Sequence, residues 1–129
     1  LSAHNKFGTC SIREVFYAIL DKLGEHPLLR QLYWRDFFSY IGFYFPHVFG
    51  SSFQKKFSNL KWRGNPDNFE KWKTGKTGFP IVDADMRELN ITGYMHNRVR
   101  MIVASFLTKD LQIDWRLGEK YFAQNLVDY

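Results

Sequence analysis

The stretch from Thr92 to Met101, TGYMHNRVRM, combines side chains that bind anions with residues that start and stop helices. Arg98 and Arg100 carry planar guanidinium groups that stay charged at physiological pH and fit phosphate or carboxylate groups through two hydrogen bonds. Two arginines near a helix N-terminus, whose free N–H groups also attract anions, indicate a phosphate-bearing partner. The same spacing is equally consistent with a solvated helix face or a buried arginine–aspartate pair.

The polar side chains of this stretch are expected to lie on a helix, and the spacing of its apolar residues predicts which face each polar side chain occupies. We expect Gly93 to end the preceding helix and a new helix to begin at Tyr94. Its predicted buried stripe recurs every three or four positions: Met95, Val99, Ile102, Val103 and Phe106. The polar residues then form two neighbouring faces, one with Asn97, Arg100 and Ala104, the other with Arg98, Met101 and Ser105.

The bulk composition predicts one globular domain from a reducing compartment. The chain has 129 residues, of which 45% are hydrophobic and 19% aromatic, so it can bury a core. The single cysteine, Cys10, excludes an internal disulfide. The histidines form no ligand pattern, so no metal site is expected, and no apolar run is long enough for a membrane span. The net charge of +5 favours nucleic acid or another polyanion as partner.

Helix start and stop signals recur through the first half, without strand alternation or repeats. Residues 11–14 form a capping box before an amphipathic helix that ends at Gly24. Another helix is predicted to start around Pro27 and must end before Pro46. No period holds over residues 46–66, so a long irregular connection is predicted there.

Similar signals organise the second half. Asp67 and Glu70 form a cap-like pair before a short helix, and Pro80 marks the start of a further one. The predicted inner face of that further helix consists of Ile81, Val82, Met86 and Leu89. Residues 115–118 are predicted to form a turn and residues 119–127 a last short helix. Together these elements predict an all-α fold.

Three tryptophans offer uses beyond packing. Trp34 beside Arg35 suits stacking on a flat ring with a phosphate contact next to it, although core packing of Trp34 is the favoured alternative. Trp62 and Trp115 can be simple core residues or can pass an electron through the protein. No Ser–His–Asp or Cys–His nucleophile and no glycine-rich phosphate loop is recognisable, so conventional acid–base catalysis finds little support.

Several segments resemble the flavin-binding helical domain of the photolyase and cryptochrome family, in order and at the family's spacing. They are KTGFPIVDADMREL at 76–89, TGYMHNRVRM at 92–101, ASFLTKDLQIDW at 104–115 and GEKYF at 118–122. Upstream, LSAHNKFGTCSIREV at 1–15 and LYWRDFF at 32–38 are similar to further family segments. The resemblance covers nearly all of the chain. It implies an all-α fold, FAD as cofactor and damaged DNA as partner.

The resemblance also implies roles by position. Those that contact or brace the FAD would be Ser2, Arg35, Asn97, Arg100 and Asp128. Those that line the lesion pocket or grip DNA would be Gln31, Trp34, Arg35, Asn97, Arg98 and Met101. Trp62 and Trp115 resemble the outer and middle members of the family's electron-transfer triad. Arg100 and Asp128 resemble the family's paired charges beneath the flavin ring. This resemblance favours the buried arginine–aspartate pair among the alternatives for Arg100.

The implied reaction is light-dependent repair of cyclobutane pyrimidine dimers in DNA, by electron transfer from photoexcited reduced FAD. The alternative is a cryptochrome, a blue-light receptor without repair activity. Gln31 favours the cryptochrome, because dimer photolyases usually have glutamate there, whereas Met101 and the basic charge favour photolyase. A third hypothesis is a helical nucleic-acid-binding module without a cofactor.

The resemblance further implies that residues 1–129 are part of a larger FAD-binding domain. An N-terminal antenna domain, with its chromophore, and the C-terminal end of the flavin pocket would lie outside this sequence. We therefore expect the 129-residue chain alone to bind FAD weakly or not at all and to be inactive in repair. The whole protein is expected to be a monomer without metal or membrane association, inside the cell in the cytoplasm or the nucleus.

Overall fold

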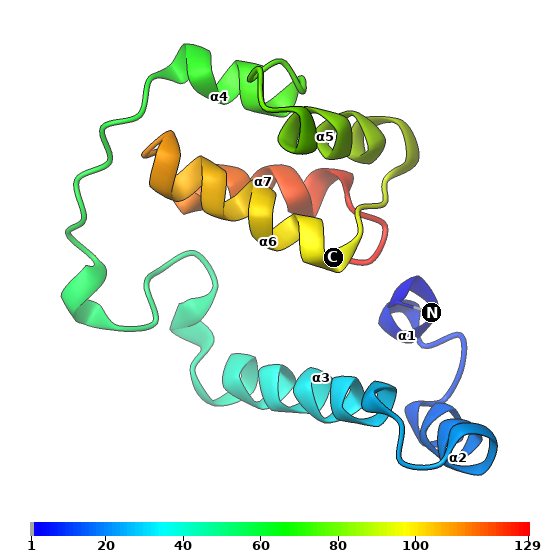
Figure 1. The fold of residues 1–129 in the computed structure, drawn as a ribbon. Helices are drawn as coiled ribbons and strands as arrows, with labels where there is room; N and C mark the ends of the chain where they lie inside the picture. Colours follow the sequence, from blue (N-terminus) through cyan, green and yellow to red (C-terminus); the bar gives the residue numbers. More distant parts are fainter. Residues whose placement is uncertain (1) are drawn as a thin grey trace. The chain divides into compact units, whose positions relative to one another are not determined.

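The computed structural model describes residues 2–129, and these form helices and connecting loops without a strand (Figure 1). The all-α prediction is therefore confirmed. The chain divides into two compact units, unit 1 up to Leu60 and unit 2 from Lys61 onward, and each is described by itself. Among the described residues, no helix is both long and apolar enough to cross a membrane.

Unit 1 is built from helices whose ends are set by local signals. Its elements are α1 (Ser2–Phe7), α2 (Ile12–Leu23), α3 (Pro27–Tyr44) and two short 3₁₀ turns, η1 (Pro46–Val48) and η2 (Lys55–Phe57). The predicted capping box precedes α2, where the Ser11 N–H donates to Glu14 Oε2 at 3.3 Å. His26 Nδ1 accepts the Leu28 N–H at 3.3 Å and caps α3. Both predicted helices are confirmed, and apart from η1 and η2 the following connection is irregular as predicted.

The helices of unit 1 pack with little burial. α2 lies against α3, where the Phe16 and Tyr33 rings meet edge to face at 6.1 Å. Leu32 is the buried hydrophobic side chain among the described residues of this unit. Phe49 and Phe53 in the irregular connection are exposed. Packing inside unit 1 is therefore shallow.

Unit 2 surrounds a tryptophan. Its elements, coloured green to red in Figure 1, are α4 (Pro66–Lys73), α5 (Pro80–Thr92), α6 (Asn97–Ser105), the π segment η3 (Phe106–Asp110) and α7 (Trp115–Asn125). Trp72 is fully buried, and its Nε1–H donates to Val103 O at 3.2 Å. The hydrophobic residues buried with it are Val82, Met86, Leu89, Met95, Val103, Phe106, Leu107 and Ile113.

Close helix packing explains the glycine in α7. A Cβ placed on Gly118 would lie 2.3 Å from Leu107 Cδ2 and 3.8 Å from Trp72 Cη2. Glycine therefore lets α7 approach the core at this point. Beside it, Tyr121 and Phe122 pack on the Trp72 indole at ring distances of 5.8 and 5.6 Å.

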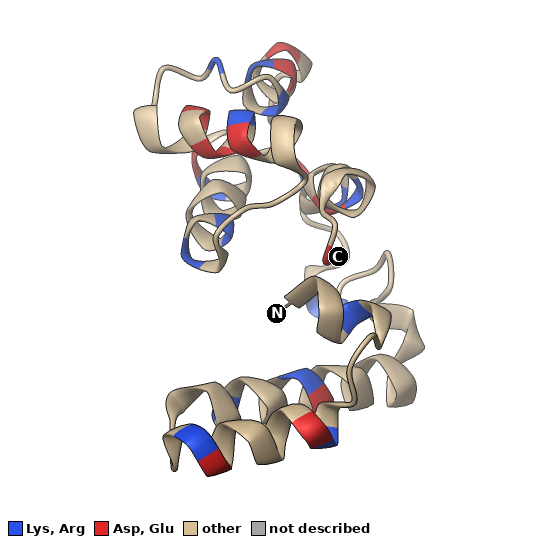
Figure 2. Ribbon diagram, turned by 90° about the vertical axis from the view of Figure 1, so that its right-hand side faces the viewer, with Lys and Arg blue, Asp and Glu red and all other residues tan. Residues whose placement is uncertain are grey.

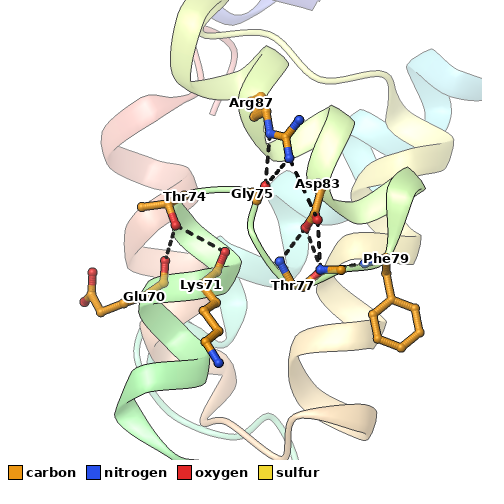
Figure 3. Close-up of polar contacts among 9 residues, drawn as sticks. Glu70, Lys71, Thr74, Gly75, Thr77, Phe79, Asp83 and Arg87 are labelled. Atoms are coloured by element: carbon orange, nitrogen blue, oxygen red, sulfur yellow. Dashed lines mark hydrogen bonds and ion pairs between the residues drawn. The ribbon is translucent and has the colours of Figure 1, made fainter.

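Figure 3 shows how Asp83 in α5 holds the loop between α4 and α5. Its carboxylate accepts hydrogen bonds from the Thr77 N–H at 2.7 Å, the Thr77 hydroxyl at 2.6 Å and the Gly78 N–H at 2.9 Å. Arg87, one turn further, donates twice to Gly75 O, at 3.0 and 2.7 Å. Burial raises the pKa of Asp83, but these hydrogen bonds and the Arg87 charge outweigh it and keep the pKa below the usual 3.8. The loop is thus closed around an ionised carboxylate.

Two predictions for α4 and α5 are wrong in detail. The cap of α4 is Asn65, whose Oδ1 accepts the Asp67 N–H at 2.9 Å, so Asp67 lies in the first turn and not at the cap. On α5, Val82, Met86 and Leu89 are buried as predicted, but Ile81 is half exposed and Asp83 is buried. The hydrogen bonds from the loop to Asp83 turn that face of the helix inward.

The boundaries around α6 and α7 also differ from the prediction. α6 begins at Asn97 and not at Tyr94, because His96 Nδ1 accepts the Arg98 N–H at 3.2 Å and caps the helix there. Residues 115–118 form the first turn of α7 and not a separate turn, since Asp114 caps the helix directly before Trp115. The π segment between the two helices was not predicted.

Candidate functional site

The start of α6 is fixed against the end of the chain. Gly93 ends α5 in the left-handed conformation at φ 71°, as predicted. Its carbonyl accepts the Val127 N–H at 2.9 Å, and a Cβ on Gly93 would lie 2.8 Å from Val127 Cγ1. Both the backbone conformation and this close approach require glycine. The turn before α6 and residues 125–127 therefore form one junction.

Arg100 and Asp128 form an ion pair beside this junction. Arg100 Nη2 donates to both carboxylate oxygens, at 2.8 and 3.0 Å, and Arg100 Nε donates to Met95 O at 2.8 Å. The side chain of Asp128 is only 4% exposed, while that of Arg100 is 23% exposed. Of the alternatives left open for Arg100, the structure has the arginine–aspartate pair. The guanidinium neutralises a carboxylate that would otherwise be costly to bury.

A cavity of about 360 Å³ lies beside the ion pair, between α6 and α7; we call it the Trp115 cavity. Its lining residues are Arg100, Ala104, Leu107, Thr108, Trp115, Gly118, Glu119, Phe122, Leu126 and Tyr129. The Trp115 indole carries the Arg116 guanidinium over its ring at 5.2 Å. The hydrogen bond to Glu119, with burial, raises the pKa of Tyr129 to about 12. This cavity therefore combines a mostly apolar wall with the Arg100 guanidinium and the Glu119 carboxylate, which is hydrogen-bonded to Tyr129.

A second, more open cavity follows the neighbouring face of α6, and we call it the Arg98 groove. It measures about 570 Å³ and is lined by Arg98, Met101, Ile102, Ser105, Phe106, Lys109 and Asp110. The two predicted faces of α6 thus border separate cavities, with Arg100 and Ala104 on one and Arg98, Met101 and Ser105 on the other. Asn97 is exposed at the first position of the helix and borders neither cavity.

Trp62 borders a third, smaller cavity of about 180 Å³. Ile113, Asp114 and Leu117 also line it, and none of its lining residues borders the Trp115 cavity. Trp62 itself is half-buried. The two tryptophans expected to carry electrons therefore line different cavities, and residues of α7 contribute to both cavities.

The remaining predicted site residues belong to unit 1. Gln31, Trp34 and Arg35 lie on one face of α3 at helical spacing. Trp34 is 48% exposed and stacks on Phe38 at 5.7 Å, so unit 1 does not bury it as core packing would require. Arg35 pairs with Asp36 at 2.9 Å in an exposed salt bridge. Ser2 is exposed at the first position of α1.

The structure thus brings some predicted residues together and leaves others in separate groups. Arg100, which is paired with Asp128, and Trp115 line one cavity, and Arg98 and Met101 line another. Acidic and basic residues occur in both units (Figure 2). Among the described residues, no cluster of three or more His, Cys, Asp or Glu side chains has the arrangement of a metal site.

One site feature escaped the sequence reasoning. Lys109 borders the Arg98 groove, and its position eleven residues after Arg98 continues the same helical face. That spacing was available as a signal. The apolar spacing that predicts the helix stops at Phe106, where the π segment begins, and Lys109 lies beyond that point.

Comparisons with known proteins agree on one family. Residues 28–129 match the family described as the FAD binding domain of DNA photolyase. The whole chain is 48% identical to a deoxyribodipyrimidine photo-lyase of Alkalihalophilus pseudofirmus and covers 28% of it. An archaeal photolyase structure from Sulfolobus tokodaii, determined with two FAD molecules, is 53% identical with a TM-score of 0.94; the match covers all of this chain and 29% of that one.

A cryptochrome structure from Synechocystis is also similar, at 35% identity and a TM-score of 0.79, over 99% of this chain and 28% of that one. The chain therefore spans between a quarter and a third of the length of these relatives.

Proposed function

Because this chain belongs to the DNA photolyase family through its FAD-binding domain, we propose that it is part of an enzyme that repairs cyclobutane pyrimidine dimers in DNA by using light. The observation that carries the proposal is the double-faced helix α6. It presents the Arg100–Asp128 pair towards the Trp115 cavity and Arg98 with Met101 towards a separate groove. Such a helix suits a position between a cofactor and a nucleic acid.

The residues around the Trp115 cavity fit a flavin. Arg100 brings a guanidinium, paired with Asp128, to a mostly apolar wall, and such a wall with a few polar groups suits a flat ring system. Asp128 holds the guanidinium in place through two hydrogen bonds. The family resemblance alone supports Asn97, Ser2 and Arg35 as further contacts to FAD.

The residues proposed for the DNA side fit a base turned out of the duplex. Trp34 is half exposed and already stacks on Phe38, so its ring is available for stacking on a flipped pyrimidine. Gln31, one turn before Trp34, offers an amide donor and acceptor to a base edge. Arg98 and Met101 would contact the strand and the lesion from α6.

When bound, reduced FAD would supply the light-driven electron-transfer chemistry that opens the cyclobutane ring. The chain's own residues would bind and orient the partners. Arg100 would present its guanidinium to the cofactor at the Trp115 cavity, while Trp115 and Trp62 would relay an electron between solvent and cofactor. No general acid or base is needed for ring opening, which agrees with the absence of a recognisable nucleophile in the sequence.

The test is a repair assay on the complete protein that carries this sequence, loaded with reduced FAD. An oligonucleotide with one pyrimidine dimer is incubated in the dark or under light, and the restored strand is separated from the dimer-containing strand. We expect restoration only under light. Absence of repair under light, with reduced flavin bound, would overturn the proposal.

Matched arginine variants separate the two proposed sides of α6. Arg100→Ala should lower the flavin content of the purified protein, whereas Arg98→Ala should keep the flavin and weaken binding of dimer-containing DNA. Arg63→Ala is the control, since Arg63 is exposed and borders none of the three cavities. Loss of flavin in the Arg98 variant would contradict this assignment.

A cryptochrome is the second candidate, because Gln31 replaces the usual glutamate of dimer photolyases and a cryptochrome structure is among the similar folds. The two functions differ in one measurement. A photolyase repairs the dimer, whereas a cryptochrome shows flavin photoreduction without repair. The Gln31→Glu variant sharpens the test, since it should raise repair in a photolyase and leave a cryptochrome inactive.

A further inference from the structure

The Arg98 groove continues beyond the residues assigned above to the DNA side. Arg98, Met101, Ile102, Ser105 and Lys109 follow one another at i, i+3, i+4, i+7 and i+11 and all line the same cavity. Eleven residues of helix extend roughly 16 Å at about 1.5 Å per residue. One DNA strand places a phosphate about every 3.4 Å along the duplex axis, so this length matches a run of about four or five phosphates.

The charges of the groove favour a polyanion over a single anion. Arg98 and Lys109 are exposed near its two ends, and the stretch of α6 between them contains no acidic residue. Ser105 adds a hydroxyl donor between the two cations. Asp110 is the acidic residue of the lining, and it lies at the Lys109 end. The two cations thus stand apart along the strand path and do not converge on one point.

The π segment gives Lys109 a fixed base. The Leu111 N–H donates to Phe106 O at 3.0 Å, five residues back, which widens the turn. Phe106 and Leu107 are both buried in the core, and the Phe106 ring packs on Phe79 at 4.8 Å. The backbone at Lys109 is therefore held by two buried residues of the same segment, and the fold fixes the position of this backbone relative to Arg98.

We propose that the Arg98 groove binds the phosphate backbone of one DNA strand and that Lys109, eleven residues after Arg98, makes a second phosphate contact. This inference rests on the proposed repair function. It adds a second, sequence-independent contact to the one proposed for Arg98, and it assigns the far end of α6 and the π segment to strand positioning.

The test compares two lysine variants of the complete, FAD-loaded protein. Lys109→Gln removes the proposed contact, and Lys120→Gln is the matched control, because Lys120 is exposed on α7 and borders none of the three cavities. Affinity for a duplex with one dimer and for the same duplex without it is measured between 0.05 and 0.3 M salt, roughly the range in which counterion release dominates.

Loss of one phosphate contact should reduce the slope of log affinity against log salt by about 0.9, which corresponds to about eightfold weaker binding at 0.1 M salt. Lys109→Gln should show this loss on both duplexes equally, so the preference for the dimer stays unchanged. Repair at saturating DNA and the melting temperature should also remain at the wild-type values, which separates a lost contact from a damaged fold. Lys120→Gln should leave the slope unchanged.

Asp110→Asn gives an effect of opposite sign. Removal of this carboxylate should strengthen binding about twofold, because it repels the same phosphates. The inference is wrong if Lys109→Gln leaves the slope of log affinity against log salt unchanged, or if Lys120→Gln lowers that slope as much as Lys109→Gln does. Light-dependent repair by the wild type would still support the proposed function in either case. If the wild type repairs no dimer, the proposed function itself fails. The two failures are therefore distinguishable.

Discussion

Trp72 in unit 2 and Trp34 in unit 1 occupy opposite environments. Trp72 is fully buried, bonded through its indole N–H to Val103 and surrounded by rings from α4 and α7. Trp34 is 48% exposed and touches its own helix neighbours Phe37 and Phe38. The first residue organises a core, whereas the second presents an aromatic face.

This difference extends to the two units as wholes. Unit 2 joins distant segments through buried contacts, such as Trp72 to Val103 and Arg100 to Asp128. In unit 1, Leu32 is the buried hydrophobic residue among those described, and its helix ends are fixed by nearby caps. The stability of unit 2 should therefore depend on long-range packing, and that of unit 1 on local signals.

The largest expected effect is that of Trp72→Ala. Removal of a buried tryptophan leaves a cavity and loses the hydrogen bond to Val103 O, and we expect a loss of about 3 to 5 kcal/mol in the free energy of unfolding. Native-state hydrogen exchange of amides in α5 measures it. The paired variant Trp34→Ala should cost less than about 1 kcal/mol, because its site is exposed. Equal losses would remove the distinction between the units.

Asp83→Ala should have the next largest effect. It leaves three donors of the α4–α5 loop without their acceptor, which we expect to cost about 2 to 3 kcal/mol. Asp83→Asn keeps one acceptor oxygen and should recover part of that loss. Asp36→Ala in unit 1 is the control, and it should change stability by less than about 0.5 kcal/mol because its salt bridge is exposed. Urea unfolding followed by hydrogen exchange measures all three.

Acid should weaken unit 2 through the same carboxyl. Burial opposes ionisation of Asp83, but hydrogen bonds from Thr77 and Gly78 and the Arg87 charge lower its pKa in the folded chain below 3.8. The unfolded chain therefore binds this proton at a higher pH than the folded chain does. The contribution is complete at neutral pH and is lost as the pH falls below about 4 towards the folded pKa. Hydrogen exchange in α5 of Asp83→Asn, compared with wild type across this range, should show a weaker pH dependence.

The smallest expected effects are those of the helix caps, and they should be alike in both units. His26→Ala removes the cap of α3 in unit 1, and Asn65→Ala removes the cap of α4 in unit 2. Each should cost about 0.5 to 1 kcal/mol, because a cap acts within one helical turn and does not depend on the core. Thermal unfolding detects such changes. A much larger loss in one unit would show that its cap also supports tertiary packing.

The helix ends that sequence reasoning predicted correctly are those with a local cause. The capping box of residues 11–14, Pro27 and Gly93 act through neighbouring backbone groups, and each is where it was expected. Asp67 misled the prediction, because Asn65, two residues earlier, offers the same chemistry and wins the cap. Caps are thus visible in a sequence, but the choice between adjacent candidates is not.

The features that were missed depend on distant partners. Asp83 looks like a surface charge in the sequence, and only the folded loop of Thr77 and Gly78 supplies the donors that bury it. The π segment at Phe106 has no signature in the sequence, and in the fold both Phe106 and Leu107 are buried. Lys109 lies within this segment, beyond the apolar spacing that predicts the helix. The ion pair of Arg100 with Asp128 joins residues 28 positions apart, and the family resemblance, not spacing, indicated it.

The junction between Gly93 and Val127 also has a kinetic consequence. One backbone hydrogen bond of 2.9 Å ties the turn before α6 to the residue next to Asp128. We expect that opening of this bond also loosens Asp128, the next residue, and so weakens its ion pair with Arg100. Amide exchange at Val127 would therefore report how often the guanidinium beside the Trp115 cavity becomes an uncompensated charge. The electrostatic potential at a flavin ring bound in the Trp115 cavity would then depend on how often the hydrogen bond between Val127 and Gly93, next to Asp128, is open.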